Sequence, residues 1–255
     1  TQKLDLSEKF RIAPDHKIKI VSLGFDLSPF LQSAAFKGRF RNSIGVSDDS
    51  FLVGIVGRLV PIKHHDMFLK MAKIFLERNP DIDAKFILVG DGELREELEA
   101  HVEKLGLKNH VSFCGWRRDL PEVYADLDVL ALTSENEGTP VSIIEAMASG
   151  TPVISTDAGG VLDLLGPAEE PSTAGGLTVC KRGVLCRKND EAGFAQGLRY
   201  LITMDKKRLK KMTDEARSFA MNTFSNKRLV HDIEALYLEI MPPFSKNLPI
   251  QEQTA

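Results

Sequence analysis

The chain has 255 residues, which is enough for one large α/β domain or for one domain with appendages. Its formal net charge of −3 excludes a global field that would attract nucleic acid, and its 43% hydrophobic content is ordinary for a soluble globular protein. Three cysteines, an odd number, favour reduced thiols and a cytoplasmic location, and no apolar run approaches the roughly 20 residues that span a bilayer.

The two ends of the chain differ from its middle. Residues 1–45 do not resemble a complete domain: a short helix is expected at 6–11, an alternating strand at 17–23 and irregular structure at 24–40. We interpret this region as a linker and first strand that arrive from a missing N-terminal domain. Residues 242–255 show no periodicity, and we expect them to form a disordered tail.

Residues 46–241 form the periodic part of the chain, in which buried-strand runs alternate with helices. Strands are predicted at residues 51–57, 84–89, 111–113, 127–132, 152–155 and 183–186. Helices are predicted at residues 65–78, 93–105, 119–125, 161–165, 190–204, 205–222 and 226–241, and a further helix ends near residue 150. Residues 166–182 look like a polar insertion. The alternation predicts a Rossmann-like α/β fold, a doubly wound parallel sheet of about six strands with flanking helices.

Such a sheet binds its ligand at the carboxyl ends of its strands. We therefore expect the loops at residues 57–63, 90–92, 115–118 and 134–140 to share one rim. The first of them carries Arg58, which can hold phosphate in a fork, and Lys63, a point charge at a helix start. The helix dipole disfavours a cation there, so an anionic ligand would explain Lys63, although a surface cation without a partner remains open.

Two carboxylates flank the helix that follows the last of these loops. Glu145 is the only charged residue between positions 138 and 156, and a carboxylate in so apolar a setting is costly unless it is paired or hydrated. Glu137 lies eight residues earlier, next to a helix N-terminus that favours anions such as phosphate. The alternatives remain open that Glu145 is a solvated helix residue and that Glu137 is a surface loop residue without a functional role.

The third loop carries the only tryptophan, Trp116, followed by Arg117. The ring could form the wall of a base-binding pocket, or it could pack the loop. Gly90 and Gly92 give half of a dinucleotide fingerprint, which more often marks a tight turn. The six histidines show no metal-ligand spacing, so we expect no metal site.

A run of basic residues opens the predicted helix at 205–222. It consists of Lys206, Lys207, Arg208, Lys210 and Lys211. A solvated helix face is the ordinary interpretation of such a run, and weak contact with anionic lipid headgroups at a membrane surface is the minority one.

Four segments, taken together, resemble the C-terminal, donor-binding domain of GT-B fold glycosyltransferases, especially the retaining family 4. They are GRLVPIK at 57–63, ILVGDGEL at 87–94, VSFCGW at 111–116 and NEGTPVSIIEAMASGTPVIST at 136–156. Glu137 and Glu145 match the family's spaced acid pair, in its E-G-x-P variant. The resemblance covers residues 17–238, and the four segments occur in family order at family spacing.

The resemblance implies an enzyme that transfers a hexosyl unit from a nucleotide-diphosphate sugar, a UDP-sugar above all, to a glycan or lipid-linked acceptor. Arg58 and Lys63 match the pair that neutralises the donor diphosphate, Glu145 the acid that binds ribose hydroxyls, and Glu137 the acid that contacts the transferred sugar. Arg58, Lys63 and Glu137 are thus the implied catalytic residues. The implied donor-binding residues are Gly57, Arg58, Lys63, Trp116, Arg117, Glu137, Gly138, Thr139, Pro140 and Glu145. Such enzymes need no cofactor and generally no divalent metal.

The chain departs from the family in two respects. The N-terminal Rossmann-like domain that binds the acceptor is absent, and His64 follows Lys63 where the family has glycine. We therefore expect this chain to bind a nucleotide diphosphate and to need an N-terminal acceptor-binding domain of the same protein for transfer. A GT-B fold sugar-nucleotide epimerase and a non-catalytic nucleotide-sugar-binding module remain the alternatives.

Overall fold

A computed structural model describes residue 3 and residues 5–169 and 176–241. It divides the chain into two compact units, one formed by residues 27–221 and the other by residues 1–26 and 222–255. The predicted tail at 242–255 and part of the predicted insertion at 166–182 lie outside the described residues.

The larger unit is built on a seven-stranded sheet in the order β3-β2-β1-β4-β5-β7-β6. The strands are β1 (Phe51–Val56), β2 (Ala84–Val89), β3 (Val111–Gly115), β4 (Val129–Leu132), β5 (Val153–Thr156), β6 (Thr178–Cys180) and β7 (Gly183–Cys186). Every neighbouring pair is parallel except β6 with β7. The predicted doubly wound parallel sheet is confirmed, and the strand order reverses between β1 and β4, the switch point at which such folds bind ligands.

The antiparallel edge strand β6 was not predicted. It has three residues and lies in the segment interpreted as a polar insertion. A run this short cannot show a period of two, so its pairing with β7 depends on the fold rather than on a local pattern.

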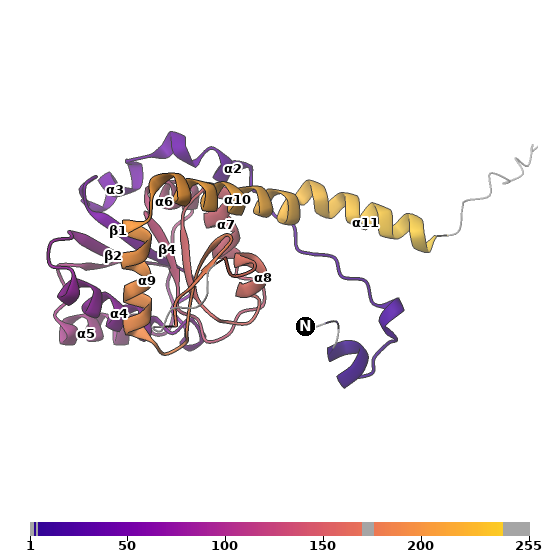
Figure 1. Ribbon diagram of the computed structural model, residues 1–255, viewed down its shortest axis with the longest axis horizontal. Helices are drawn as coiled ribbons and strands as arrows, with labels where there is room; N and C mark the ends of the chain where they lie inside the picture. The colour runs from indigo at the N-terminus through magenta and orange to yellow at the C-terminus, as the bar shows by residue number, and fades with distance from the viewer. Residues whose placement is uncertain (1–2, 4, 170–175, 242–255) are drawn as a thin grey trace, which may run out of the picture. The chain divides into compact units, whose positions relative to one another are not determined.

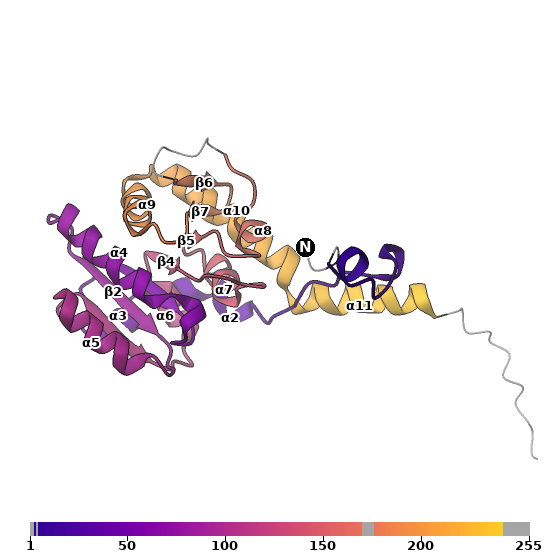
Figure 2. The same ribbon diagram turned by 90° about the horizontal axis from the view of Figure 1, so that it is seen from below.

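Helices cover both faces of this sheet. They are α2 (Ser28–Leu31), α3 (Arg39–Ile44), α4 (His65–Arg78), α5 (Arg95–Leu105), α6 (Leu120–Asp126), α7 (Val141–Ser149), α8 (Val161–Leu165), α9 (Glu191–Thr203) and α10 (Lys206–Phe224). One layer contains α4, α5 and α9, and the other contains α6 and α7 with α2 and α3 (Figures 1 and 2). Val53 and Ile55 of β1 point into the first layer, where the rings of Phe68 and Phe75 meet Phe86 edge to face.

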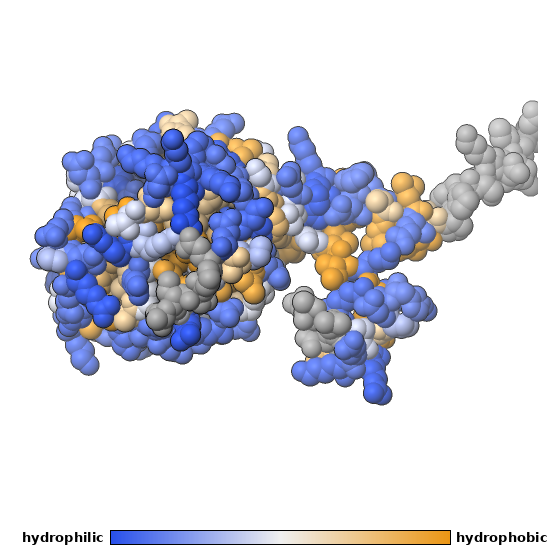
Figure 3. Space-filling view, viewed as in Figure 1, coloured by the Kyte–Doolittle hydropathy of each residue, from blue (hydrophilic) through white to orange (hydrophobic). Residues whose placement is uncertain are grey.

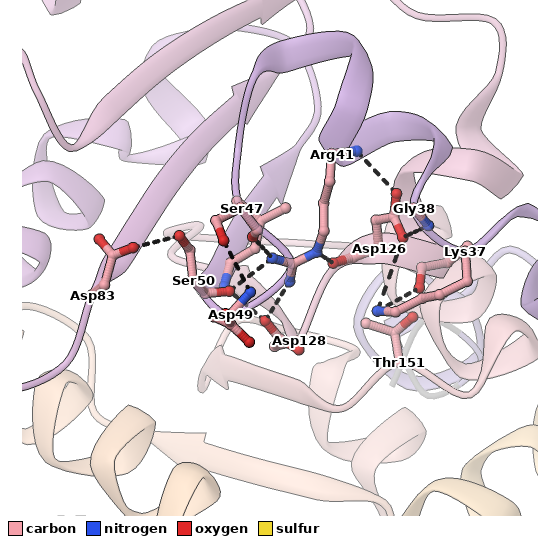
Figure 4. A network of polar contacts seen from close by, with 12 residues as sticks. Lys37, Gly38, Arg41, Ser47, Asp49, Ser50, Asp83, Asp126, Asp128 and Thr151 are labelled. Atoms are coloured by element: carbon pink, nitrogen blue, oxygen red, sulfur yellow. Dashed lines mark hydrogen bonds and ion pairs between the residues drawn. The ribbon is translucent and has the colours of Figure 1, made fainter.

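Residues 27–44 fold as α2, a 3₁₀ turn at Ser33–Phe36 and α3, so the irregular structure predicted for 24–40 is wrong in this part. Arg41 anchors the segment, and its side chain is 1% exposed. The guanidinium donates to the carbonyl oxygens of Ser47 and Ser50, both at 2.7 Å, to that of Asp126 at 3.1 Å, and to the Asp128 carboxylate at 2.7 Å (Figure 4). A buried charge is tolerated because each of the three guanidinium nitrogens donates to at least one acceptor.

The smaller unit contains α11 (Asn226–Ile240), a π-helical turn at Asp5–Lys9 and a 3₁₀ turn at Asp15–Lys17. The strand predicted for 17–23 is wrong, because residues 18–24 form neither helix nor strand. Ile20 is 70% exposed and Leu23 is 53% exposed, so the alternating apolar residues do not face a sheet. None of the helices described here is long and apolar enough to cross a bilayer.

Candidate functional site

The loops that follow β1, β2 and β3 are joined by backbone hydrogen bonds at the carboxyl edge of the sheet. The N–H of Leu59 donates to Asp91 O at 3.0 Å, and the N–H of Gly90 donates to Gly115 O at 2.8 Å. Gly90 has a φ of +137°, and a Cβ there would lie 1.9 Å from Gly57 O. Only glycine permits this approach, which explains the G-x-G pattern as a close loop contact.

The loop that follows β4 joins the same edge. The N–H of Glu135 donates to Ile62 O at 2.9 Å, and the hydroxyl of Thr133 donates to Lys63 O at 3.1 Å. All four loops predicted to share one rim are therefore in contact through their backbones.

Lys63 and Glu137 meet on this rim. The Lys63 ammonium lies 2.6 Å from Glu137 Oε1, and the Ser134 hydroxyl donates to the same oxygen at 2.6 Å. The Lys63 and Glu137 side chains are 21% and 11% exposed, so the pair is largely shielded from water. Lys63 is thus not a surface cation without a partner, and Glu137 is not a decorative loop residue.

Arg58 is exposed, and it makes no hydrogen bond or ion pair with any residue that the structure describes. Its neighbour Gly57 is fixed by an N–H bond to Val89 O at 2.9 Å. The guanidinium is therefore attached to a rigid backbone at the rim, and its five N–H donors are available to an anion.

Glu145 lies in the middle of α7 and is half-buried. Tyr124 of α6 donates its hydroxyl to Glu145 Oε2 at 3.0 Å. Burial raises the pKa of Glu145, and the Tyr124 hydrogen bond opposes that shift. Glu145 is therefore not a solvated helix residue. Tyr124 was missed by sequence reasoning, because a tyrosine in a short predicted helix gives no signal of its partner.

The turn after β5 supports the backbone of the loop that carries Glu137. The N–H of Gly160 donates to Glu137 O at 3.1 Å, and a Cβ at Gly160 would lie 1.9 Å from Gly138 O. A Cβ at Gly159 would lie 2.1 Å from Glu137 O. This pair of glycines is the packing surface on which the Glu137 backbone rests.

The start of α7 is open. Gly138 and Thr139 are exposed, Pro140 is the N-cap residue, and no side chain caps the helix. Backbone N–H groups at such a terminus favour an anion or a ligand hydroxyl.

The loop after β3 presents two residues in different ways. Trp116 is 72% exposed, so it does not pack the loop, and the Arg118 guanidinium lies 5.7 Å from its ring. The Arg117 guanidinium donates twice to the Asp119 carboxylate and lies 5.3 Å from the Phe40 ring. A ligand at this loop would meet Trp116 and the backbone of Arg117 rather than the Arg117 side chain.

A buried histidine lies behind Lys63. His65, the first residue of α4, is 2% exposed, and neither ring nitrogen has a hydrogen-bond partner among the described residues. Burial lowers its pKa to about 4, with help from the charges of Lys63 and His64. The ring is therefore neutral near pH 7. Within the described ranges, no group of three or more histidine, cysteine, aspartate or glutamate residues is placed to hold a metal ion.

Comparison with known proteins identifies the family to which the chain belongs. Residues 36–219 match the family model described as Glycosyl transferases group 1. An Escherichia coli protein named UDP-Gal:alpha-D-GlcNAc-diphosphoundecaprenol alpha-1,3-galactosyltransferase is 32% identical over 227 residues, which cover 88% of this chain and 55% of that protein.

Solved structures show the same fold. The crystal structure of Anabaena HepE in complex with UDP has a TM-score of 0.76 at 24% identity, and the match covers 94% of this chain and 62% of that one. A glycosyltransferase from Rickettsia africae has a TM-score of 0.77 at 20% identity, with 93% and 61% covered. This chain thus spans less than two thirds of the length of each relative. Since the family model covers most of the chain, and the relatives share its fold, the chain belongs to the group 1 glycosyl transferases, GT-B fold enzymes.

Proposed function

We propose that this chain is the donor-binding half of a retaining glycosyltransferase that transfers a hexosyl unit from a UDP-sugar to a glycan or lipid-linked acceptor. The observation that carries the proposal is the contact between Lys63 and Glu137. These residues are 74 positions apart in the chain and lie 2.6 Å apart at the ligand-binding edge of the sheet.

Each rim residue has a role in this proposal. Arg58 and Lys63 bind the diphosphate and stabilise the negative charge that develops on it as the glycosidic bond breaks, which is commonly the largest catalytic contribution. Glu137, held by Ser134 and Lys63, accepts hydrogen bonds from the transferred sugar, with the N–H groups of Gly138 and Thr139 beside it.

The nucleoside lies farther along the same edge in this arrangement. Glu145 accepts hydrogen bonds from the ribose hydroxyls, and Trp116 and the backbone of Arg117 border the base. Two observations support uridine as the base: UDP is bound in the HepE structure, and the Escherichia coli relative is named for UDP-Gal.

The acceptor half is proposed to lie outside this chain, which spans 55% of that relative. We therefore expect the chain to bind UDP and to transfer sugar poorly or not at all. Titration calorimetry with UDP, GDP and ADP tests this expectation. UDP should bind most tightly of the three, and no binding of any of them at about millimolar concentration would contradict the assignment.

Two other functions predict different results. An epimerase of the same fold would turn over UDP-N-acetylglucosamine without an acceptor. A non-catalytic nucleotide-sugar module would keep its biological role in the full-length protein after Glu137→Ala. The Lys63–Glu137 pair and the unpaired Arg58 favour the transferase, because cations beside a diphosphate stabilise a leaving group.

A second surface bears on where the enzyme works. Lys181 and Arg182 of the β6–β7 turn border a cavity of about 660 Å³ with Lys207, Lys210 and Lys211 of α10, and we call these five residues the basic surface. The acids that line the cavity are Asp214 and Glu215. The surface over α10 is strongly hydrophilic on the face shown in Figure 3.

We propose that the basic surface makes weak contact with anionic headgroups at the cytoplasmic face of a membrane, where a lipid-linked acceptor would be presented. Sedimentation with vesicles tests it at about 0.15 M salt. The protein should sediment with anionic vesicles and remain in the supernatant with neutral vesicles. Lys207→Glu, Lys210→Glu and Lys211→Glu together should abolish retention, while the same change at Lys70, Lys104 and Lys108 should not. Equal retention of the two triple variants would contradict the proposal.

A further inference from the structure

Tyr124 is fixed on every side inside the larger unit. Its side chain is 1% exposed, and its ring meets Phe30 of α2 edge to face with the centroids 5.8 Å apart. Its carbonyl oxygen accepts a hydrogen bond from the Thr151 hydroxyl at 2.8 Å. Its own hydroxyl therefore has a fixed position, from which it donates to Glu145 Oε2 at 3.0 Å.

The two oxygens of Glu145 are not equivalent. Oε2 receives the Tyr124 hydroxyl, whereas Oε1 has no protein partner in the described part of the chain. Glu137 shows the same division, because Ser134 and Lys63 both bind its Oε1. Each acid of the pair thus has one oxygen held by a hydroxyl group and one that can accept hydrogen bonds from a ligand.

The charged groups near α7 are directed elsewhere. On α6, Glu122 pairs with Arg39 at 3.3 Å, and the Asp126 carboxylate accepts from the N–H of Arg41 at 2.9 Å. Arg217 of α10 donates to the carbonyl oxygen of Ala148 at 2.8 Å. The described parts of α2, β4 and β5 carry no charged residue. Tyr124 is therefore the one described side chain that donates a hydrogen bond to the Glu145 carboxylate, and it opposes the effect of burial on that group.

We propose that Tyr124 is a positioning residue that holds Glu145 Oε2 so that Oε1 faces the vicinal hydroxyls of a ribose and selects ribonucleotides. The proposal rests on the proposed function, because it assigns Glu145 to the ribose of the donor. It goes beyond that function by naming the residue that makes the carboxylate selective. Burial raises the pKa of Tyr124 well above its usual value, so the phenol remains a donor across the working pH range.

The test compares UDP with its 2′,3′-dideoxy analogue by calorimetry between pH 5 and pH 8. Wild-type chain should prefer UDP. In Tyr124→Phe the affinity for UDP should fall about tenfold, as expected for loss of one hydrogen bond to a charged group, and the affinity for the analogue should stay within twofold. The pH below which UDP binding weakens should also move upward, because the remaining effect of burial favours protonated Glu145.

Two further variants separate positioning from packing. Phe30→Leu removes the ring contact of Tyr124 but leaves its hydroxyl, so it should keep the wild-type ratio of the two affinities. In a Glu145→Gln background, Tyr124→Phe should change UDP affinity less than twofold, since Glu145→Gln has already removed the charged carboxylate that the Tyr124 hydroxyl holds.

The outcomes distinguish this inference from the function on which it rests. No binding of UDP by wild-type chain overturns both. If wild type binds UDP but Tyr124→Phe leaves the ratio of the affinities for UDP and the dideoxy analogue unchanged, the role of Tyr124 alone is overturned. An equal loss of affinity for both nucleotides is one form of that result.

Discussion

The carboxylates of Glu137 and Glu145 are held by hydrogen bonds from neutral or positively charged side chains. Glu137 accepts from the Lys63 ammonium and from the Ser134 hydroxyl, both at 2.6 Å, and Glu145 accepts from the Tyr124 hydroxyl at 3.0 Å. Each carboxylate keeps an oxygen for a ligand, while Arg58 remains unpaired among the described residues. The charged groups that we propose to bind a sugar nucleotide are thus already in place without a ligand, which reduces the cost of ordering them.

Arg58→Ala and Glu145→Ala should each weaken UDP binding by about 1.5–3 kcal/mol, because each removes a hydrogen bond to a charged group. Titration calorimetry gives the difference directly. Arg78→Ala, at the exposed end of α4, is the matched control for loss of a positive charge. A loss under about 0.5 kcal/mol in either variant would count against its assigned role.

Ser134→Ala should weaken binding of a UDP-sugar by about 1 kcal/mol, because Glu137 loses one of its two holding groups. Binding of UDP itself should change little, since Glu137 is assigned to the sugar. Ser43→Ala, whose hydroxyl binds the carbonyl of Phe40, serves as the control. An equal effect on UDP and on the UDP-sugar would place Glu137 elsewhere in the site.

At the level of elements, the buried guanidinium of Arg41 joins α3 to the segment before β1, to the end of α6 and to the segment between α6 and β4. Its acceptors are carbonyl oxygens of Ser47, Ser50 and Asp126 and the Asp128 carboxylate. Arg41→Ala should lower the free energy of unfolding by about 3–5 kcal/mol, because it leaves buried acceptors without donors. Arg39→Ala removes a partly exposed ion pair with Glu122 and should cost under about 1 kcal/mol. Urea denaturation of both variants checks the contrast, and similar losses would contradict it.

The start of α4 makes stability depend on pH through His65. The pKa of the ring is about 4 in the folded chain against an ordinary 6.5, so the unfolded chain binds the proton more readily. The stability that the neutral ring contributes is complete above about pH 6.5 and is lost as the pH falls toward 4. The loss should reach about 3 kcal/mol. His65→Leu should flatten this part of the curve of unfolding free energy against pH, and an unchanged slope would show that other groups cause it.

The elements also show how far local pattern can predict this structure. The strands β1 and β2 and the helix α4 were predictable, because each is a strongly periodic run between clear breaks. Residues 17–23 alternate just as clearly, yet they have no neighbouring strand, and alternation by itself cannot supply one. The helices α2 and α3 are too short for periodicity, and their positions depend on long-range packing, of α2 against α7 and of α3 against α6.

The site shows the same limit. Arg58, Lys63 and Glu137 could be proposed from sequence because they are charged residues next to a strand end or a helix start, and Glu145 because it is the only charged residue between positions 138 and 156. Their partners could not be selected in the same way. Ser134, Tyr124 and Gly160 are common residue types, and they matter only because the fold brings them to the acid pair.

At the scale of the whole molecule, two surfaces could attract an anion, although the chain has a net charge of −3. The rim presents Arg58 and Lys63, and the basic surface borders a cavity of about 660 Å³ with five cationic and two acidic side chains. The size of the cavity favours the basic surface as a nucleotide site. The converging loops, the acid pair and the switch point of the sheet favour the rim.

The measurement that decides between them is a map of backbone amide shifts on addition of UDP, recorded by NMR on the isotopically labelled chain. Binding at the rim predicts changes at the non-proline residues of 57–63, 115–117 and 137–145, and no changes at residues 181–182 and 207–211. Changes confined to the basic surface, with the rim unaffected, would contradict it.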